Sequence, residues 1–400
     1  MKLALLSYEY PPDTGFGGIG TYTWHQARAL ARLGHEVHVI AGSSDRRVRR
    51  SEMHEGVTVW RATSGRAAAL SARVLSRLRM WWSSNRLDTA AAMAAAVRRL
   101  EREHRFDAIE MPECGAEGLL VTRIAAAPTV VRLHSPARLI MPMYDVRPLD
   151  RWLCARLEVP ALRRANAVTS SSRFLRDAAV ATLGVRRPID VLPNGIDVAW
   201  FDAADRHDVR AEAGIGPDVP VILFAGRMER RKGIHLCPQI ATAVLERHEA
   251  AFVFAGRDLF GFLERTLLPA LRARPLHGTV HVLGALDLSR MRSWMHAADV
   301  VLLPSLWESC PYSCLEAMAA GRAILASDAG GLPELIEDSV SGLLAPSGDS
   351  AAFIGQLDRL LADPGLRQRL GTAARRAAET TYRDSVVAER SVAVYRSAAS

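Results

Sequence analysis

Short, mostly apolar runs recur along the first half of the chain, each followed by a longer polar stretch. The clearest runs are Lys2 to Ser7, Glu36 to Ala41, Phe106 to Glu110, Thr129 to Leu133 and Ala167 to Ser170. Nearly continuous apolar character predicts strands buried on both faces of a parallel sheet. The stretch from about Thr21 to Leu33 instead has apolar residues at helical spacing. Strand and helix therefore alternate, as in a doubly wound α/β domain.

The same alternation starts again after Pro193-Asn194-Gly195, a turn in which asparagine and glycine tolerate positive φ. Further strands are predicted at Val221 to Ala225, Ala251 to Ala255, Thr279 to Leu283, Val300 to Leu303, Ala323 to Ala326 and Gly342 to Leu344. The pattern predicts one domain over residues 1–195, a linker near 192–205 and a second domain over 196–380. A last helix is expected at about 384–397, within a terminal segment of residues 381–400.

Two glutamates follow the predicted strand Val300 to Leu303. Glu308 lies in the loop beyond the strand, and Glu316 lies in the first turns of the next predicted helix. Because ligands bind at the carboxyl ends of strands in an open parallel sheet, both acids can face one crevice and bind sugar hydroxyls. They could equally be ordinary surface acids. Gly330-Gly331 favours a site, because glycines let the backbone approach a ligand closely.

A cluster of cations follows the first predicted strand of the second domain, in Gly226-Arg227-Met228-Glu229-Arg230-Arg231-Lys232-Gly233. A helix is expected from about Ile234, so its N–H groups could converge with Arg227 and Lys232 on one pyrophosphate. The alternative is a solvated basic turn, which is what most runs of charge are. Arg230 and Arg231 receive no role.

Two features of the first domain lie at the corresponding edge. Gly17 and Gly18 stand between the first strand and the first helix, where helix N–H groups and the macrodipole can bind an anion. A plain flexible turn would contain the same glycines. His134 directly follows a strand and so lies at the ligand edge, although a hydrogen-bonded loop histidine is the alternative.

Together, the Gly17-Gly18 loop, the Gly226-Arg227 to Lys232-Gly233 segment and the Glu308 to Glu316 pair resemble the retaining glycosyltransferases of family 4. The signature of that family is Glu, seven residues, Glu, and its domain junction matches residues 193–197. The resemblance covers nearly the whole chain. It implies an α/β fold of two Rossmann-like doubly wound parallel-sheet domains facing a cleft, termed GT-B, with a C-terminal helix crossing back to the N-terminal domain.

The resemblance also implies roles. Glu316 would bind the ribose hydroxyls of a nucleotide sugar, Glu308 and His134 would contact the transferred sugar, and the first domain would bind the acceptor. The implied catalytic residues are His134, Arg227, Lys232 and Glu308. The implied donor-binding residues are Gly17, Gly18, Gly226, Arg227, Lys232, Leu286, Glu308, Leu315 and Glu316.

One segment departs from the family pattern. Many members have Pro-Phe-Gly after the first glutamate, whereas this chain has Ser309-Cys310-Pro311. Proline lacks an amide N–H, so a backbone contact to the transferred sugar would be lost or moved. No Asp-x-Asp pair occurs at a fitting place, so neither a metal nor a cofactor is expected beyond the nucleotide sugar as co-substrate.

The charge adds an expectation about partners. The chain has 51 Lys and Arg against 43 Asp and Glu, a formal net charge of +8, which attracts anions. Nucleic acid is disfavoured, because zinc-finger spacing, a ribonucleoprotein signature and long basic runs are missing from the sequence. Residues 66–105 combine Trp81-Trp82 with the arginines Arg66, Arg73, Arg77, Arg79 and Arg86. This combination suits an anionic membrane surface, a polyanionic or lipid-linked acceptor, or a helix with a solvated arginine face.

The sequence predicts a cytoplasmic protein, peripheral on the inner face of the membrane. No apolar run reaches the ~18 residues that span a bilayer, and the first residues lack the features of a signal peptide. The five cysteines have no Cys-x-x-Cys spacing, so reduced thiols are expected.

The function predicted is retaining transfer of a hexosyl unit from a UDP-, GDP- or ADP-linked sugar to a glycan, lipid-linked or small-molecule acceptor, in envelope or exopolysaccharide biosynthesis. A glycogen- or sucrose-synthase-like enzyme is an alternative. A non-catalytic sugar- or lipid-binding relative is another, although it would be expected to have lost Arg227 and Lys232. A dinucleotide-dependent oxidoreductase is disfavoured, because Gly15-Phe16-Gly17-Gly18 does not fit the Gly-x-Gly-x-x-Gly register.

Overall fold

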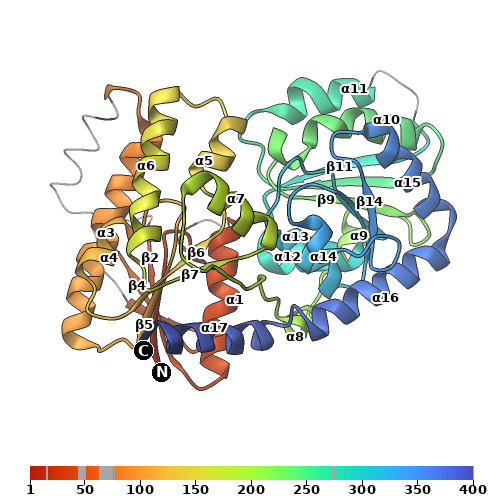
Figure 1. Ribbon diagram of the computed structural model, residues 1–400. Coiled ribbons are helices and arrows are strands. Elements are labelled where there is room, and N and C mark those ends of the chain that lie inside the picture. Colours follow the sequence, from red (N-terminus) through yellow and green to blue (C-terminus); the bar gives the residue numbers. More distant parts are fainter. Residues whose placement is uncertain (15–16, 44–50, 63–74, 76, 273–275, 400) are drawn as a thin grey trace. The chain divides into compact units, whose positions relative to one another are not determined.

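The computed structural model describes residues 1–14, 17–43, 51–62, 75, 77–272 and 276–399 (Figure 1). The chain divides into two compact units. The first contains Met1–Gly195 and Asp384–Ser400, and the second contains Ile196–Arg383. The chain thus leaves the first unit after Gly195 and returns to it at Asp384.

Within the described residues, the first unit is built on an eight-stranded sheet. Its strands, in spatial order, are β3 (Ser51–His54), β4 (Val57–Arg61), β2 (Glu36–Ala41), β1 (Lys2–Ser7), β5 (Ala108–Pro112), β6 (Thr129–Leu133), β7 (Ala167–Ser170) and β8 (Asp190–Val191). Neighbouring strands are parallel except β3 and β4. The central strands are buried along nearly their whole length, as their continuous apolar character predicts.

Helices cover both faces of this sheet. They are α1 (Gly18–Arg32), α3 (Trp81–Glu103), α4 (Gly118–Ile124), α5 (Ala137–Ile140), η1 (Met141–Met143), α6 (Pro148–Arg164), α7 (Arg173–Leu183) and α17 (Asp384–Ala399). Figure 1 shows α3, α4 and α6 packed together on one side of the sheet and α1 beside α17 on the other. The first unit is therefore doubly wound.

A buried network fixes α17 to the rest of the first unit. Glu110 of β5 accepts a hydrogen bond from the Tyr22 hydroxyl (2.7 Å) and another from the Tyr395 hydroxyl of α17 (2.8 Å). Gln26 of α1 in turn donates to the Tyr395 oxygen at 3.4 Å. Burial raises the pKa of both tyrosines well above the ordinary value, so both hydroxyls remain donors.

The second unit has a six-stranded, fully parallel sheet in the described residues. Its spatial order is β11 (Thr279–Gly284), β10 (Ala251–Ala255), β9 (Val221–Ala225), β12 (Val300–Leu303), β13 (Ala323–Ser327) and β14 (Leu343–Ala345). Its core contains Phe252 and Phe254, whose rings stack with centroids 5.6 Å apart, and Phe353 of a covering helix. The strand residues of this core are spaced two apart along each strand, so they line one face of the sheet.

The helices of the second unit are α8 (Val198–Asp202), α9 (Val209–Glu212), η2 (Arg230–Lys232), η3 (Ile234–Leu236), α10 (Cys237–Leu245), η4 (Leu263–Leu267), α11 (Leu268–Arg272), α12 (Leu288–Ala297), α13 (Tyr312–Ala319), α14 (Leu332–Leu335), α15 (Ser350–Ala362) and α16 (Pro364–Thr380). Helices α10, α11 and α15 pack together, as do α12, α13 and α16. The predicted class of two Rossmann-like, doubly wound parallel-sheet domains is confirmed.

The helix expected from about Ile234 starts as a 3₁₀ turn, Ile234–Leu236, which runs directly into α10 at Cys237. Another 3₁₀ turn, Arg230–Lys232, precedes it. Between the turns stands Gly233 at φ +76°, packed so closely that a Cβ there would lie 1.8 Å from the Pro304 carbonyl oxygen. This close approach and the positive φ both require glycine, and Gly233 separates the two 3₁₀ turns.

None of the described helices is both long enough and apolar enough to cross a membrane.

Candidate active site

Glu308 is the centre of a buried ion-pair cluster in the second unit. Its Oε1 accepts hydrogen bonds from the Lys232 ammonium (2.5 Å) and the Ser305 hydroxyl (2.9 Å). The Arg231 guanidinium lies 3.5 Å from Oε2, so each carboxylate oxygen faces a cation. Burial alone would raise the pKa of Glu308, but Lys232, Arg231 and the hydroxyl hold it below the ordinary value. The carboxylate is therefore ionised at neutral pH.

Adjacent parallel strands bring this cluster together. Lys232 ends the η2 turn that follows β9, and Glu308 lies in the loop that follows β12, the neighbour of β9 in the sheet. The Leu306 amide donates to the Arg231 carbonyl oxygen at 2.8 Å, which joins the two loops directly. The carboxyl ends of neighbouring strands are where such sheets bind ligands.

The Gly330-Gly331 pair contacts the backbone of Glu308. Gly330 has φ +64°, and a Cβ there would lie 2.1 Å from the Glu308 carbonyl oxygen. The Gly331 amide donates to the same oxygen at 2.9 Å. The close approach that requires glycine is thus between two loops of the protein.

Arg227 and Lys232 belong to the same turn but have different surroundings. The Arg227 side chain is 48% exposed and lies 3.3 Å from buried Glu229, which also accepts hydrogen bonds from Arg231 at 3.1 and 2.9 Å. Lys232 is mostly buried, and burial lowers its pKa although Glu308 opposes the shift. Gly226 lies beside the Lys232 stem, since a Cβ on it would be 3.9 Å from the lysine Cδ. Arg227 is accordingly the cation that a solvent-borne anion reaches first.

Glu316 lies on α13 and is half-buried. Loss of water raises its pKa to about 7, and only the Lys232 charge opposes that shift. Lys232 thus acts electrostatically on both glutamates of the predicted pair. Leu315, also on α13, is 0% exposed. Leu286 is half-buried in the loop between β11 and α12.

In the first unit, His134 lies on a loop that a buried carboxylate holds. The His134 and Ser135 amides donate to the two oxygens of Glu113, at 2.8 and 2.6 Å. The imidazole packs against the Tyr22 ring with centroids 5.0 Å apart. Burial, assisted by the Arg132 charge, lowers the pKa of His134 well below the ordinary value. A neutral imidazole at the carboxyl end of β6 follows.

Two residues of these clusters were missed by the sequence reasoning. Glu113 directly follows β5, the neighbour of β6, and its position after a strand was the available signal. Burial and the Glu158 charge raise its pKa to about 8 even though two amides donate to it. Arg231 was left without a role because a cation beside two others carries no pattern of its own.

Arg86 was wrongly grouped with the solvent-facing arginines. It is buried, and its guanidinium donates two hydrogen bonds to Glu158 Oε1 at 2.9 and 2.8 Å. The other oxygen of Glu158 accepts from the amide of Ala137, the first residue of α5, which follows the His134 loop. Arg66 and Arg73 of the same predicted surface lie outside the described residues.

Gly17 and Gly18 stand at the start of α1, and residues 15 and 16 of their loop lie outside the described ranges. Gly18 is exposed, and a Cβ on it would meet no atom within 4 Å. A Cβ on Gly17 would lie 1.9 Å from the Glu9 carboxylate. An acid at this helix start opposes the predicted binding of an anion there unless it moves.

Two family models match the chain in tandem. The model described as Glycosyltransferase Family 4 matches residues 16–200, and the one described as Glycosyl transferases group 1 matches residues 205–377. The chain belongs to glycosyltransferase family 4. The resemblance found in the sequence motifs is thereby confirmed.

Similar proteins include other glycosyltransferases over their full length. The α-maltose-1-phosphate synthase of Mycobacterium tuberculosis is 27% identical over 422 residues, covering 99% of this chain and 99% of that protein. The structure of sucrose-phosphate synthase from Thermosynechococcus elongatus matches with a TM-score of 0.80 at 21% identity, covering 99% and 98% of the two chains. That of HepE from Anabaena in complex with UDP-glucose matches with a TM-score of 0.74 at 20% identity, covering 99% and 100%. Both structures are of the GT-B type, which is the fold of this chain.

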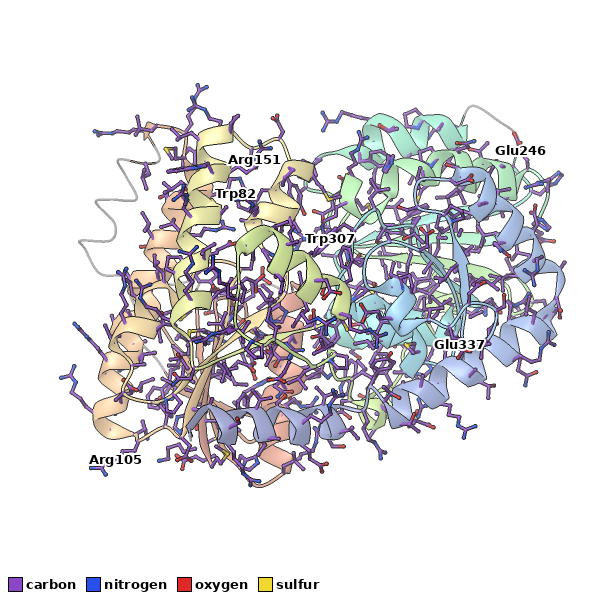
Figure 2. The ribbon with its side chains drawn as sticks, in the orientation of Figure 1. Trp82, Arg105, Arg151, Glu246, Trp307 and Glu337 are labelled. Carbon is purple, nitrogen blue, oxygen red and sulfur yellow. The ribbon has the colours of Figure 1, made fainter. Side chains whose placement is uncertain are left out.

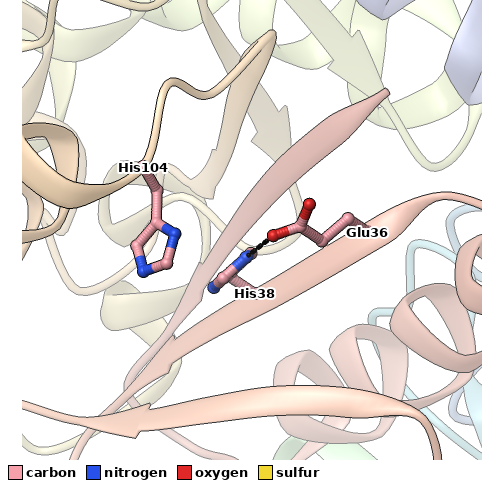
Figure 3. Close-up of side chains that lie close together, drawn as sticks. All are labelled: Glu36, His38 and His104. Atoms are coloured by element: carbon pink, nitrogen blue, oxygen red, sulfur yellow. Dashed lines mark hydrogen bonds and ion pairs between the residues drawn. The ribbon is translucent and has the colours of Figure 1, made fainter.

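In this family 4 glycosyltransferase, one group of three described side chains has the composition of a metal site. Ligand atoms of Glu36, His38 and His104 lie within 4.8 Å of one another (Figure 3). However, the Trp60 indole N–H donates to His38 Nδ1 at 2.9 Å, so in a neutral imidazole the proton is on Nε2. Nε2 faces Glu36 Oε1 at 2.9 Å, and the Lys2 ammonium lies 3.0 Å from the same oxygen. A protonated Nε2 has no lone pair for an ion, so the group is a hydrogen-bonded chain.

Proposed function

We propose that the protein transfers a hexosyl unit from a nucleoside diphosphate sugar to an acceptor hydroxyl, with retention of anomeric configuration. The observation that carries the proposal is the cluster around Glu308 at the carboxyl ends of β9 and β12. There Lys232 and Arg231 face an ionised carboxylate, and Glu316 lies on the helix that follows. Lys232 and the exposed Arg227 of the same turn are the cations proposed for the diphosphate, and the two carboxylates are proposed for sugar hydroxyls.

The chemistry proposed is electrostatic. Cleavage of the bond between the sugar C1 and the diphosphate oxygen leaves negative charge on the diphosphate. Arg227 and Lys232 would neutralise that charge as it develops. The acceptor oxygen would form its bond to C1 on the same face, and its proton would pass to an oxygen of the departing phosphate. This path retains configuration and requires neither a protein base nor a metal.

Each glutamate has a role that its surroundings favour. Glu308 is ionised and fixed, so it would accept hydrogen bonds from the transferred sugar without having to lose a proton. Glu316, with a pKa of about 7, would accept from ribose hydroxyls in its ionised form. In the first unit, His134 is neutral and would contact the transferred sugar by hydrogen bonding.

The substrates are proposed from the relatives and from the charge of the chain. HepE was solved with UDP-glucose, and α-maltose-1-phosphate synthase and sucrose-phosphate synthase are named for phosphorylated sugars. A UDP-, GDP- or ADP-linked hexose is therefore the proposed donor class. An anionic acceptor, either lipid-linked in envelope or exopolysaccharide assembly or a sugar phosphate, fits the net charge of +8.

The test is the thermal midpoint of the protein with UDP, GDP and ADP, each at about 100 times its dissociation constant. A ligand at that level adds about 2.7 kcal/mol to the folded state, which for a domain of this size raises the midpoint by roughly 5–10 °C. The nucleotide that raises the midpoint identifies the base of the sugar donor.

Lys232→Ala should lose most of that shift, measured against its own ligand-free midpoint. The matched control is Arg230→Ala, which removes an exposed cation from the same turn and should keep the full shift. If no nucleotide raises the wild-type midpoint, or if Lys232→Ala keeps the shift, the proposed donor site is wrong.

A further inference from the structure

Large apolar side chains are exposed together at one corner of the first unit, where α3 and α6 begin. They are Leu78 (56% exposed), Trp81 (61%), Trp82 (48%), Leu149 (61%) and Trp152 (53%). Three of the eight tryptophans of the chain thus face solvent in one place. An indole normally buries its large apolar surface, so a cluster of exposed indoles indicates a surface that binds a partner.

The corner is rigid, because Asp150 fastens the first turn of α6 to the start of α3. Met80 before α3 provides no side-chain cap. Instead, the buried Asp150 carboxylate accepts from the amides of Trp82 (3.1 Å) and Ser83 (2.9 Å). Figure 2 shows Trp82 near Arg151, the residue after Asp150. The Asp150 side chain therefore joins the starts of the two helices that bear the exposed indoles.

Arginines surround the exposed side chains. Arg77, Arg79, Arg147 and Arg156 are exposed and Arg151 is half-buried, against one exposed acid, Asp145. The Arg156 guanidinium lies 4.9 Å from the centroid of the Trp152 ring. Arg147 donates to the Leu78 carbonyl oxygen at 2.7 Å. The corner therefore presents indoles and leucines within a strongly positive rim.

Indoles with adjacent cations have the chemistry of the interface of an anionic bilayer. Tryptophan rings bury at the depth of the headgroups, and arginines pair with lipid phosphates. A protein partner would need acidic and apolar surface in matching places, whereas an anionic membrane supplies both everywhere. We propose that this corner docks the protein on an anionic lipid surface.

The corner lies at the ligand edge of the first unit. Four residues separate the end of α3 from the start of β5, and two residues separate the end of α6 from the start of β7. Their C-termini therefore lie at the amino ends of the strands, and their N-termini lie at the carboxyl ends, where His134 follows β6. A docked membrane would meet the edge that holds His134. Lipid docking does not depend on the proposed transferase function, although it would present a lipid-linked acceptor there.

The experiment is co-sedimentation of the full chain with phosphatidylcholine vesicles, with and without phosphatidylglycerol. The wild type should co-sediment with the vesicles that contain phosphatidylglycerol and should stay in the supernatant with phosphatidylcholine alone. The triple variant W81A/W82A/W152A should bind at least about tenfold more weakly. R77Q/R151Q should bind about thirtyfold more weakly at low salt and lose this difference at high salt, since each surface cation strengthens binding by about fivefold.

The matched control is L259A/F260A in the second unit, where Leu259 is 63% and Phe260 is 52% exposed. It should bind vesicles as the wild type does. Every substituted side chain reaches solvent, so unchanged thermal midpoints will show that the fold is intact.

Equal sedimentation of wild type and triple variant, or equal binding to both vesicles, would overturn the proposal. A molar mass in sedimentation velocity that is smaller for the triple variant than for the wild type would also overturn the proposal. It would show that a second copy of the chain covers the corner in the wild type. The L259A/F260A control shows whether weaker vesicle binding is specific to this corner or follows from any loss of exposed apolar area.

Discussion

Replacing Lys232 by alanine should destabilise the second unit, because it removes the closer of the two cations that face buried Glu308. Deleting one partner of a buried ion pair costs about 3–5 kcal/mol. Here the Arg231 guanidinium at 3.5 Å and the Ser305 hydroxyl at 2.9 Å remain. The expected loss at pH 7 is therefore smaller, about 2–3 kcal/mol, which lowers the midpoint of a unit of this size by roughly 5–10 °C.

The electrostatic origin of this loss of stability can be tested through its pH dependence. In the wild type the folded pKa of Glu308 is below its ordinary value, so its stabilising contribution is present above that value and is lost as the pH falls. In Lys232→Ala burial should prevail and raise the pKa above 4.5. The contribution of Glu308 to the free energy of unfolding is then most favourable at low pH, where the carboxyl is protonated, and it decreases as the pH rises. The penalty of the substitution should thus shrink by about half or more between pH 7 and pH 5.

Differential scanning calorimetry at both pH values measures this difference, since it separates the transitions of two units that unfold independently. Arg230→Ala, an exposed cation of the same turn, is the control and should change stability by less than about 0.5 kcal/mol at either pH. A penalty that is equal at pH 7 and pH 5 would refute the electrostatic account of the Lys232–Glu308 pair.

Two further predictions concern other buried charges. Because the pKa of Glu316 is about 7, nucleotide binding that needs its ionised oxygens should weaken about tenfold from pH 8 to pH 6. Titration calorimetry on Glu316→Gln measures how the dissociation constant changes with pH because of the nucleotide alone. An equal change with pH in the wild type and in this variant would contradict the role of Glu316. In the first unit, Arg86→Met should cost about 3–5 kcal/mol in denaturant unfolding by leaving Glu158 unpaired. The double variant R86M/E158Q should recover at least half of that loss, R77Q should be silent, and additive penalties would rule out the pairing.

The elements that place the site were predictable because their signals are local. Continuous apolar runs gave the parallel strands, and loops after such strands hold the ligand-facing residues. Glu308 and Glu316 were therefore assigned to one crevice, and the family resemblance added Lys232 to the same site. The structure places the Lys232 ammonium 2.5 Å from Glu308 Oε1. Their partnership with each other did not follow from sequence, since it depends on β9 and β12 being neighbours although they are far apart along the chain.

Glycines were harder to interpret than charges. Gly233 and Gly330 lie near the cluster, and a ligand was the expected reason for the second of them. In the structure each instead touches a carbonyl oxygen of a neighbouring loop, of Pro304 and Glu308 respectively. A sequence shows that a backbone approach is needed there, but not what approaches.

Arginine illustrates why net charge is a weak guide to surface function in this chain. Among the residues that the structure describes, five arginines are buried, namely Arg61, Arg86, Arg132, Arg231 and Arg292. Their guanidinium groups bind internal acids and carbonyl oxygens, as Arg292 does with the Trp200 carbonyl at 2.8 Å and Asp205 at 2.7 Å. Such cations contribute to the formal charge of +8 but offer nothing to a partner. The argument for an anionic surface therefore depends on where cations remain exposed beside apolar side chains, and the start of α3 and α6 meets that condition.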